Sequence, residues 1–300
     1  MSELIFNIEG TEYASSLALW LALMAAVLHA SFGALQKGRH DPWLSRGAID
    51  LNYFLIMLPV ALFVVPWPEP EIWPIFFGAW FIHTIYKWFQ AEAYSRGAYT
   101  VVYPIVRGTS PLLTILIAGI LFGETFSLIQ WLGISVMCSG IFGLALYNLY
   151  KTSVDRDVLK VAIILAVFTG AGAASYTAFD AYGIRQTLDP FTFIAWLFVF
   201  DGIVFPIIAY FKLRSARQIP KLLPLYLRGF SGGVIAIFSF GAIMLATRLD
   251  KVGEAAVLRE TSTIFAAIIG YFILKETVGL ARFLMIALIA VGAVIVEFGS

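Results

Sequence analysis

Ten apolar segments, each close to 20 residues long, constrain this chain more than any other feature of its sequence. An α-helix that crosses the hydrocarbon core of a bilayer needs about 20 consecutive, mainly apolar residues. Short polar breaks separate the segments, which leave no room for a separate soluble domain. The predicted spans are 17–36, 49–67, 73–94, 99–122, 128–149, 160–184, 191–211, 222–246, 251–274 and 278–297. The sequence therefore predicts an all-α polytopic membrane protein with ten transmembrane helices.

The composition agrees with this prediction and excludes other classes. Hydrophobic residues make up 60% of the chain and charged residues only 13%, against roughly 25% charged residues in a soluble domain. The net charge is +1 and no basic run occurs, which argues against a nucleic-acid partner. The single cysteine, Cys138, lies inside a predicted span and cannot form an intramolecular disulfide.

The distribution of Lys and Arg predicts the orientation in the inner (plasma) membrane. These residues accumulate in short cytoplasmic loops. The loops after odd-numbered spans carry most of them, whereas the other side, with both tails, holds only Arg185, Arg248 and Lys251. We therefore expect both termini on the outer, periplasmic side. Residues 1–16 are acidic and are predicted to be an extramembrane tail, not a cleaved signal peptide.

A weak internal repeat relates the two halves of the chain. Displacing the sequence by 152 residues aligns "RGTSPLLTILIAGILFGET", which starts at Arg107, with "RETSTIFAAIIGYFILKET", which starts at Arg259. We therefore predict two five-helix repeats, 17–150 and 151–300. An odd number of spans in each repeat forces the second repeat to be inverted. Inverted repeats are common in secondary transporters, whose substrate site lies near the midplane of the membrane.

Several segments resemble EamA-type transporters of the drug/metabolite transporter superfamily. They are "HASFGALQK" (29–37), "HTIYKWFQAEAYSRG" (83–97), "VYPIVRGTSPLL" (102–113), "ASYTAFDAYGIR" (174–185) and "LRETSTIFAAIIGYFILKE" (258–276). The resemblance implies ten helices in inverted halves, a central cavity and alternating access. Where the family leads us to expect Gly-Asp, this chain has Gly97-Ala98, so no role of that acid is carried over. Members of the superfamily carry amino acids, sugars, nucleotide conjugates and drugs, and the resemblance does not choose among them.

Arg107 and Arg259 are the strongest candidates for a binding site. Each lies eight residues into its predicted span, about 12 Å along the helix axis. An Arg at the centre of a span costs roughly 2.5 to 3.5 kcal/mol on insertion scales, so such residues usually face a bundle interior or a wet cavity. Two guanidinium groups facing one cavity would bind a planar anion bidentately. Lys87 and Arg228 lie closer to positions from which a long side chain reaches the membrane surface.

A second interpretation of the two arginines stays open. Each could be a structural lock, paired with an internal acid such as Glu260, Glu254 or Glu92. Glu260 follows Arg259 directly and so points about 100° away around the helix, which favours a pair with another helix. One arginine would then be neutralised and the other left free.

Pro104, Gly108 and Pro111 surround Arg107 and are predicted to form a gate. Each proline removes a backbone donor, so the helix is expected to kink or open there. Irregular backbone at membrane depth is tolerated where it lines a wet cavity or is packed in protein. The matching segment "VLRETSTIF" contains neither Pro nor Gly. We therefore expect the fourth span to move, although a kink that only shapes packing is the alternative.

A polar stripe on the third span is the second part of the predicted substrate site. His83, Tyr86, Gln90 and Tyr94 recur at i, i+3, i+7 and i+11 and share one helix face. Tyr103, four residues before Arg107, adds an aromatic ring beside the arginine. These groups can hydrogen-bond a substrate and cover its apolar part. The alternative is a hydrogen-bonded seam between helices.

The second half supplies further titratable groups. Tyr176, a predicted substrate contact, lies one turn before Asp180, and Asp201 lies near the middle of its span. Intramembrane acids are candidates for proton relays or counter-ions. No phosphate-binding GxxxxGK[ST] loop is present, so proton coupling is expected, with the candidate groups Glu260, Asp180, Asp201, His83 and His29. Two histidines on different spans without ligand spacing predict no metal site, and no cofactor is expected.

Two structural predictions concern the helix ends and the scaffold. Glu124 and its counterpart Glu276 close the fourth and ninth spans, where a carboxylate is expected to cap the next helix. Small residues in the spans 128–149 and 278–297 are expected to permit close helix contact.

The sequence as a whole predicts a secondary transporter that moves a small organic anion or zwitterion, such as an amino acid or a related carboxylate or phosphonate. The alternatives are a flippase for anionic lipid headgroups, whose cavity would open sideways to the bilayer, and an exporter of cationic drug-like compounds. An intramembrane enzyme would need a nucleophile–base pair or a metal cluster that the sequence does not contain. Substrate identity, transport direction and oligomeric state stay open.

Overall fold

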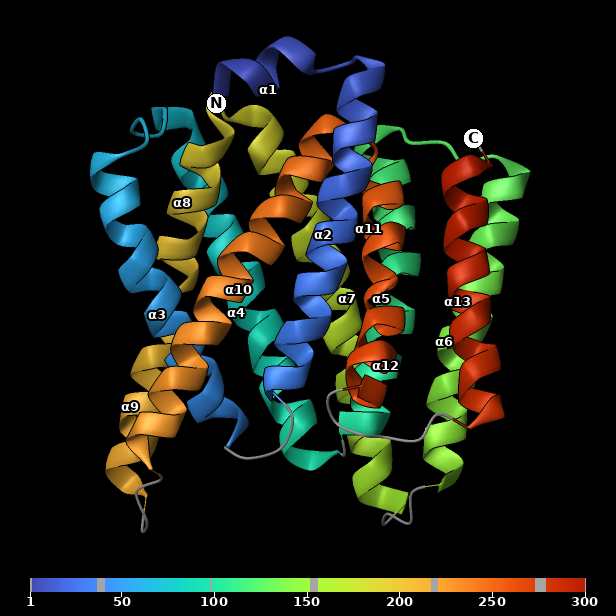
Figure 1. Ribbon diagram of the computed structural model, residues 1–300. Helices are drawn as coiled ribbons and strands as arrows, with labels where there is room; N and C mark the ends of the chain where they lie inside the picture. Colours follow the sequence, from blue (N-terminus) through green and yellow to red (C-terminus); the bar gives the residue numbers. More distant parts are fainter. Residues whose placement is uncertain are drawn as a thin grey trace.

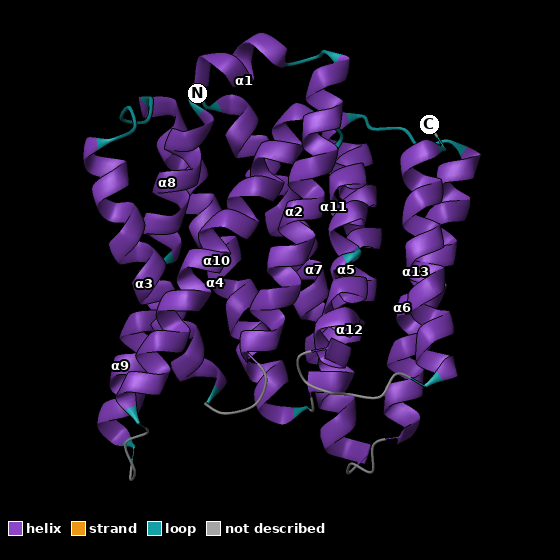
Figure 2. Cartoon of the chain, viewed as in Figure 1, coloured by secondary structure: helices purple, strands orange, loops and turns teal. Residues whose placement is uncertain are grey.

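The computed structural model describes residues 2–36, 41–97, 99–151, 156–216, 221–272 and 279–299. These residues are almost entirely helical and contain no strand (Figures 1 and 2). In chain order the helices are α1 (Ser2–Ile8), α2 (Glu12–Gln36), α3 (Pro42–Phe63), the short 3-10 helix η1 (Pro70–Ile72), α4 (Trp73–Arg96), α5 (Tyr99–Phe122), α6 (Leu128–Lys151), α7 (Arg156–Gln186), α8 (Pro190–Asp201), α9 (Val204–Ser215), α10 (Leu222–Leu249), α11 (Val252–Glu260), α12 (Ser262–Phe272) and α13 (Leu280–Phe298).

The helices form one bundle with the architecture of a polytopic membrane protein. Eight segments are long and apolar enough to cross a membrane, and one of them, Pro190–Ser215, joins α8 and α9. Helix α4 and the pair α11 and α12 also run along the bundle (Figure 1), which accounts for all ten predicted spans. Both termini lie at the same end, and α2 and α7, which begin the two halves, run in opposite directions.

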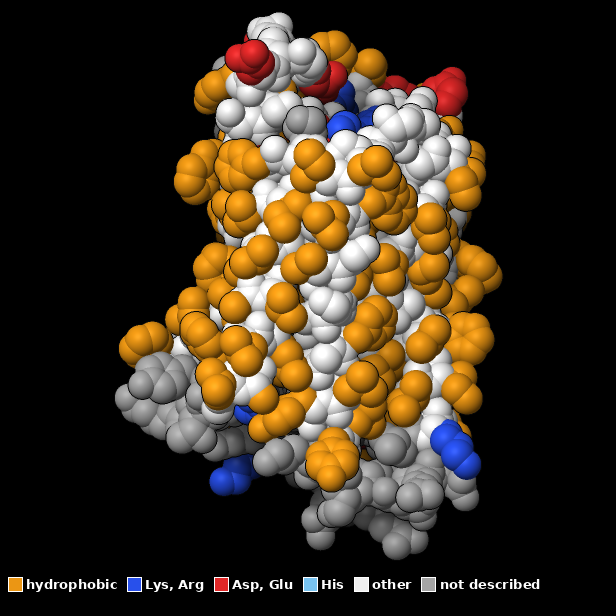
Figure 3. Space-filling view, turned by 90° about the vertical axis from the view of Figure 1, so that its right-hand side faces the viewer, with side chains coloured by type: hydrophobic (Ala, Val, Ile, Leu, Met, Phe, Trp, Pro, Cys, Tyr) orange, Lys and Arg blue, Asp and Glu red, His pale blue; other side chains and the backbone are white. Residues whose placement is uncertain are grey.

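The outer surface is that of a protein surrounded by lipid. Figure 3 shows apolar side chains covering the middle of one face, with charged side chains only towards the two ends. Large residues on α13 face outward, including Phe283 and Leu284, whose exposed fractions are 60% and 54%. In water such a surface would drive association, whereas hydrocarbon accepts it.

Helix α3 begins seven residues before the predicted span at 49. The side chain of Asp41 caps it, accepting hydrogen bonds from the backbone N–H groups of Trp43 (2.9 Å) and Leu44 (3.1 Å). Pro42 takes the first helical position, where a missing N–H costs nothing. The early start places Arg46 and Asp50 in the same helix, one turn apart, and both side chains lie in the protein interior.

The amino-terminal segment also differs from the predicted tail. Residues Ser2–Ile8 form α1, which lies across one end of the bundle (Figure 1), and α2 begins at Glu12. Glu9 accepts a hydrogen bond from Arg248 at 2.5 Å, which fastens this segment to the end of α10.

The helix break that was expected at Pro104 and Pro111 is found in the other half of the chain. Helix α5 runs uninterrupted through both prolines, whereas the matching span breaks at Thr261, between α11 and α12. The Thr261 N–H and hydroxyl both donate to the carbonyl of Leu258, at 3.0 and 2.6 Å. A hydroxyl that competes for backbone carbonyls in this way favours a turn. Pro104, Gly108 and Pro111 therefore do not mark a break in the helix.

A second break separates α8 from α9. Helix α8 ends at Asp201, and the N–H of Gly202 turns back to the carbonyl of Phe198 at 3.0 Å. A Cβ on Gly202 would come within 2.6 Å of the Phe54 side chain, so only glycine fits against α3. Both breaks in the second half thus directly follow charged residues.

Glycine has a packing role at three other positions. A Cβ on Gly108 would lie 2.8 Å from the ring of Phe142 on α6, which gives this residue a packing role beside Arg107. On Gly133 and Gly140, a Cβ would lie 2.8 Å from the Gly292 carbonyl oxygen and 2.6 Å from that of Met285. The predicted close contact between α6 and α13 is therefore confirmed.

Glu124 caps a helix, but not the one predicted. Its carboxylate accepts from the backbone N–H groups of Val252 (2.6 Å) and Gly253 (2.9 Å) at the start of α11. Helix α6, which follows Glu124, is capped by Ser127 and Gln130 through local hydrogen bonds. The carboxylate therefore links the two halves of the chain. Its counterpart Glu276 lies outside the described residues.

Candidate functional site

Lys87 is the centre of a buried ionic network. Its side chain is 1% exposed, and its Nζ lies 2.7 Å from Asp50 Oδ2 and 2.6 Å from Asp201 Oδ1. It also donates to the Tyr53 hydroxyl at 2.7 Å. The expectation that Lys87 reaches the membrane surface is therefore wrong. An ammonium group held by two carboxylates and a phenol is satisfied where it lies.

The break after α8 contributes directly to this network. Because the helix ends at Asp201, its backbone carbonyl is free to accept a further hydrogen bond from Lys87 at 3.0 Å. The Tyr53 hydroxyl donates to Asp201 Oδ2 at 2.7 Å. On α3, Arg46 Nε lies 2.8 Å from Asp50 Oδ1, one turn away. Side chains of α3 and α8 thus converge on Lys87 of α4.

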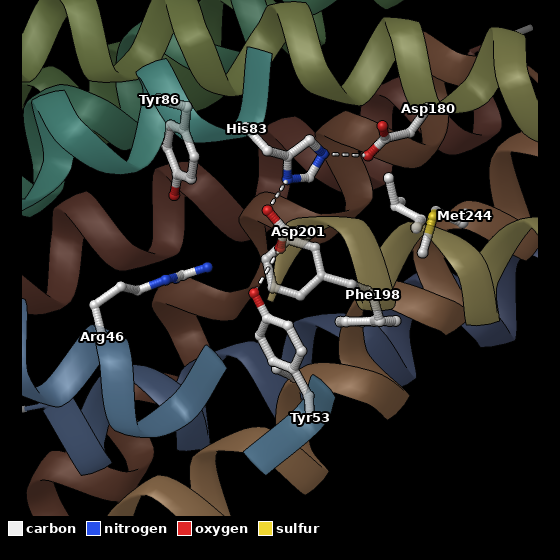
Figure 4. Close-up of a pocket in the computed structure, with 11 residues that line it drawn as sticks. Arg46, Tyr53, His83, Tyr86, Asp180, Phe198, Asp201 and Met244 are labelled. Carbon is white, nitrogen blue, oxygen red and sulfur yellow. Dashed lines mark hydrogen bonds and ion pairs between the residues drawn. The ribbon is translucent and has the colours of Figure 1, made fainter. Parts of the chain in front are cut away.

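His83 lies one turn before Lys87 on α4 and joins the network to α7. Its Nε2 is 2.9 Å from Asp180 Oδ2, and its Nδ1 is 3.5 Å from Asp201 Oδ1 (Figure 4). The ring packs against Tyr176, with centroids 4.6 Å apart. The second oxygen of Asp180, Oδ1, is buried and has no hydrogen-bond partner among the described residues.

A cavity opens beside this network. Its empty space is about 390 Å³, the open space at its mouth included. Charged, aromatic and apolar side chains all line it, and Figure 4 shows His83 between Asp180 and Asp201. The lining residues are Arg46, Tyr53, His83, Tyr86, Asp180, Leu197, Phe198, Asp201, Ala236, Phe240 and Met244. The polar stripe predicted on the third span thus places His83 and Tyr86 on a cavity.

A second cavity adjoins the first and contains Arg259. The two cavities share Asp180, Phe240 and Met244. The second is also lined by Tyr176, Thr177, Ile243, Thr247 and Arg259. Arg259 is 3% exposed, and among the described residues it donates one long hydrogen bond, 3.4 Å, to the Thr177 hydroxyl. Within the described part of the chain, no carboxylate lies within ion-pair distance of it, and its Nε has no partner.

Arg107 is in a different situation from Arg259, although the two positions match in the repeat. Arg107 Nη1 lies 2.8 Å from Glu260 Oε1, and both side chains are buried. The guanidinium carbon also lies 5.2 Å from the centre of the Tyr103 ring. Arg107 therefore ties α5 to α11, as in the lock interpretation, and lines neither of the two cavities.

The remaining predicted residues lie around these cavities. Gln90 donates to the Tyr86 hydroxyl at 2.6 Å, which orients that phenol. The His29 ring packs against Phe240, centroids 6.1 Å apart, behind the lining of both cavities. Pro111 is buried in α5. The structure brings His83, Tyr86, Tyr176, Asp180 and Asp201 together, and leaves Pro104, Gly108 and Pro111 on the Arg107 helix.

Sequence reasoning missed Arg46, Asp50 and Tyr53 as site residues. The predicted span 49–67 leaves Arg46 in a loop and Asp50 at the span end, because the sequence pattern does not reveal that α3 begins at Pro42. A signal was present, since the three positions i, i+4 and i+7 share one helix face, as do His83 and Lys87.

Helices long and apolar enough to cross a membrane, packed around internal cavities that adjoin buried charges, define a polytopic membrane protein of the transporter class. A model of the EamA-like transporter family matches residues 16–146 and again 160–298. The chain belongs to this family. A solved crystal structure is similar over 96% of this chain and 99% of its own, with a TM-score of 0.68 and 15% identity, a likeness of fold. No relative of similar sequence is found among proteins of curated function.

Proposed function

We propose that this protein is a secondary transporter that moves a small organic anion or zwitterion, such as an amino acid or a related carboxylate or phosphonate, by alternating access. The observation that carries the proposal is Arg259, a buried guanidinium on a cavity wall without an acidic partner among the described residues. A buried charge that the protein does not neutralise is costly. A substrate carboxylate would supply the missing partner, bidentately.

The break at Thr261 supports the same assignment. Arg259 lies in the last turn of α11, and α12 begins at Ser262. Transporters commonly bind anionic substrate groups at the N-terminus of a half-helix, where the helix dipole favours negative charge, and the N-terminus of α12 lies three residues after Arg259. The pairing of Arg107 with Glu260 also favours one anion pole at Arg259 over two.

The shape of the second cavity suits a substrate with a small apolar part. Phe240, Ile243 and Met244 line it on one side and Tyr176 on another. Such side chains cover aliphatic or aromatic groups without demanding hydrogen bonds. The substrate would therefore carry its charge at Arg259 and its apolar group against α10.

The orientation and energy source are part of the proposal. The Lys and Arg bias favours a place in the inner membrane with both termini outside. Proton coupling is the proposed energy source.

Transport by purified protein in proteoliposomes tests this function. Radiolabelled neutral amino acids, carboxylates, phosphonates and organic cations are offered in turn, and we expect saturable flux of the anions or zwitterions. Arg259→Gln should weaken substrate affinity about 10-fold or more, because a charge-assisted hydrogen bond contributes about 1.5 to 3 kcal/mol.

Arg228→Gln is the matched control. Arg228 is a half-buried arginine of α10 that lines neither cavity, so its loss should leave affinity unchanged. Saturable flux of cations alone, or equal effects of the two substitutions, would rule out the anion site at Arg259.

A further inference from the structure

Six ionisable side chains form one continuous chain through the bundle. It runs from Asp180 on the cavity walls to Arg46 near the start of α3, and successive members lie between 2.6 and 3.5 Å apart. The members, in order, are Asp180, His83, Asp201, Lys87, Asp50 and Arg46. Three are carboxylates and two, Lys87 and Arg46, are cations held by those carboxylates. The protonation of the sixth member, His83, then decides the net charge of the chain.

Both ring nitrogens of His83 face carboxylates. A neutral imidazole donates from one nitrogen only, whereas the imidazolium donates from both. The protonated ring donates a hydrogen bond from Nε2 to Asp180 (2.9 Å) and holds its second N–H, at Nδ1, within ion-pair distance of Asp201 (3.5 Å). It also brings the chain of six to zero net charge, which a medium of low dielectric constant favours.

Asp180 connects this proton to the substrate. It lines both cavities, and its Oδ1 is buried and unpartnered in the described structure. Arg259 faces the second cavity from α11, beyond ion-pair distance of Asp180. An ammonium group placed on Asp180 would supply the positive charge that the imidazolium otherwise supplies.

We propose that His83 is the site of the coupling proton, and that a substrate ammonium group bound by Asp180 displaces it, so that one proton leaves for each zwitterion bound. This inference rests on the proposed function and narrows it to exchange of a zwitterion for a proton. In the bound state the substrate carboxylate neutralises Arg259, and the ammonium takes the place of the His83 charge. The proton leaves the ring for the water of the cavity, so charge and atoms balance.

The other groups that face His83 do not supply an equivalent proton site. From α3, Tyr53 donates to Asp201, and Asp50 is held by Lys87 and Arg46. From α7 and α4, the phenols of Tyr176 and Tyr86 lie against the ring or each other. Phenols and a lysine between two carboxylates keep their protons at neutral pH, whereas histidine exchanges its proton there.

Proton release on binding is the direct test. Calorimetric titration of the purified full chain with L-leucine, in two buffers of different ionisation enthalpy, counts the protons released per molecule bound. We expect close to one proton released per leucine bound. In the pH range in which His83 of the free protein is protonated, the apparent affinity should fall about 10-fold for each unit by which the pH is lowered. N-acetyl-L-leucine, which lacks the ammonium, should release none. Binding of L-leucine without proton release would overturn the inference while leaving the proposed function intact.

Two variants separate His83 from other titrating groups. His83→Gln should abolish proton release and make any remaining leucine binding independent of pH. His29→Gln removes a histidine that lines neither cavity and should release the proton as the unaltered protein does. Equal release from both variants would overturn the assignment to His83.

A measurement without ligand keeps the proton site falsifiable even if L-leucine does not bind. In a His29→Gln, His40→Gln background, ¹⁵N spectra of the labelled imidazole report His83 alone. We expect the ring to be protonated at the pH of the binding experiment, and its titration to move to lower pH in Asp180→Asn. A ring that is already neutral at that pH contradicts the proposal. Failure of all transport with a normal titration would instead refute the proposed function.

Discussion

Arg107 and Arg259 occupy matching positions in the repeat and yet do different things. Glu260 neutralises Arg107 across the interface between α5 and α11, which leaves Arg259 to the cavity. The asymmetry follows from one pair of matching positions. The second half has Glu260 there, and the first half has Gly108.

The first prediction concerns the cost of breaking this pair. Arg107→Gln leaves the Glu260 carboxylate buried without a cation and should destabilise the protein by about 3 to 5 kcal/mol. Adding Glu260→Gln should recover most of that loss, since the unpaired charge is then removed. Unfolding of the purified protein in mixed detergent and SDS micelles measures both variants.

The matched control for the pair is Arg259→Gln, which leaves no ion-paired acid behind among the described residues. Its effect on stability should be clearly smaller than that of Arg107→Gln. A double variant as unstable as Arg107→Gln alone would show that the ion pair is not the source of the loss.

At the residue scale, the sequence identified charged groups better than their partners. Arg107, Arg259, Asp180 and Asp201 stand out because each lies well inside an apolar segment. The sequence did name Glu260 as a partner for an arginine on another helix, and Glu260 pairs with Arg107. The meeting of Asp50, Lys87 and Asp201 from α3, α4 and α8 could not be read in the same way. Lys87 was misassigned for this reason. A long side chain is expected to reach the surface only when no buried acid faces it.

At the element scale, α6 and α13 pack closely against each other. Their glycines allow backbone approach that a methyl group would prevent, as the 2.6 Å distance from a Cβ on Gly140 to the Met285 carbonyl shows. A backbone carbonyl cannot move aside as a flexible side chain can. A methyl group at Gly140 would therefore force the two helices apart.

The second prediction uses two glycines of α6 that lie three residues apart. Gly140→Ala should lower stability by more than 1 kcal/mol, roughly the cost of overpacking. Gly143→Ala is the control, because its Cβ would meet Met285 at an ordinary 3.5 Å and alanine favours helix. Thermal unfolding followed by size-exclusion chromatography compares them, and equal losses would contradict the packing argument.

The helix boundaries show where sequence patterns fail for elements. Apolar segments of about 20 residues located all ten spans, because the thickness of the hydrocarbon core dictates their length. Pro104 and Pro111 suggested a break that α5 does not have, since neighbouring helices and small adjustments can satisfy the freed carbonyls. The break at Thr261 carries no Pro or Gly and depends on a local hydroxyl to carbonyl contact, which apolar periodicity does not reveal.

On the scale of the whole molecule, the end that carries both termini is tied together by two arginines. Arg248 donates to the carbonyls of Ile184 (2.6 Å) and Thr187 (2.7 Å). Arg185 donates to the carbonyls of Thr247 (2.9 Å) and Asp250 (2.7 Å). These bonds hold the end of α7 against the end of α10, directly above the cavity that contains Arg259.

The third prediction is that these ties keep the cavity closed towards the termini. In a Cys138→Ser background, Ile243→Cys places a thiol on the wall of the second cavity. The double variant Arg185→Ala, Arg248→Ala should increase labelling of that thiol by a membrane-impermeant reagent applied on the side of the termini, about 10-fold if two or more hydrogen bonds are lost.

Arg214→Ala is the control for this measurement, since Arg214 is exposed at the end of α9, away from the termini. Its labelling should match that of the protein with both ties intact. Labelling that responds equally to both changes would show a general loosening of the fold.

The two helix breaks, after Asp201 and at Thr261, both belong to the half that begins at α7. Their counterparts α3 and α5 in the first half run without interruption. Two perfectly equivalent inverted halves would give the inward-open and outward-open states equal free energy. In a transporter that works by the proposed alternating access, joints in one half only would remove that degeneracy, so one of the two states would be favoured at rest. The substrate would then meet different apparent affinities on the two faces of the membrane, even with no gradient across it.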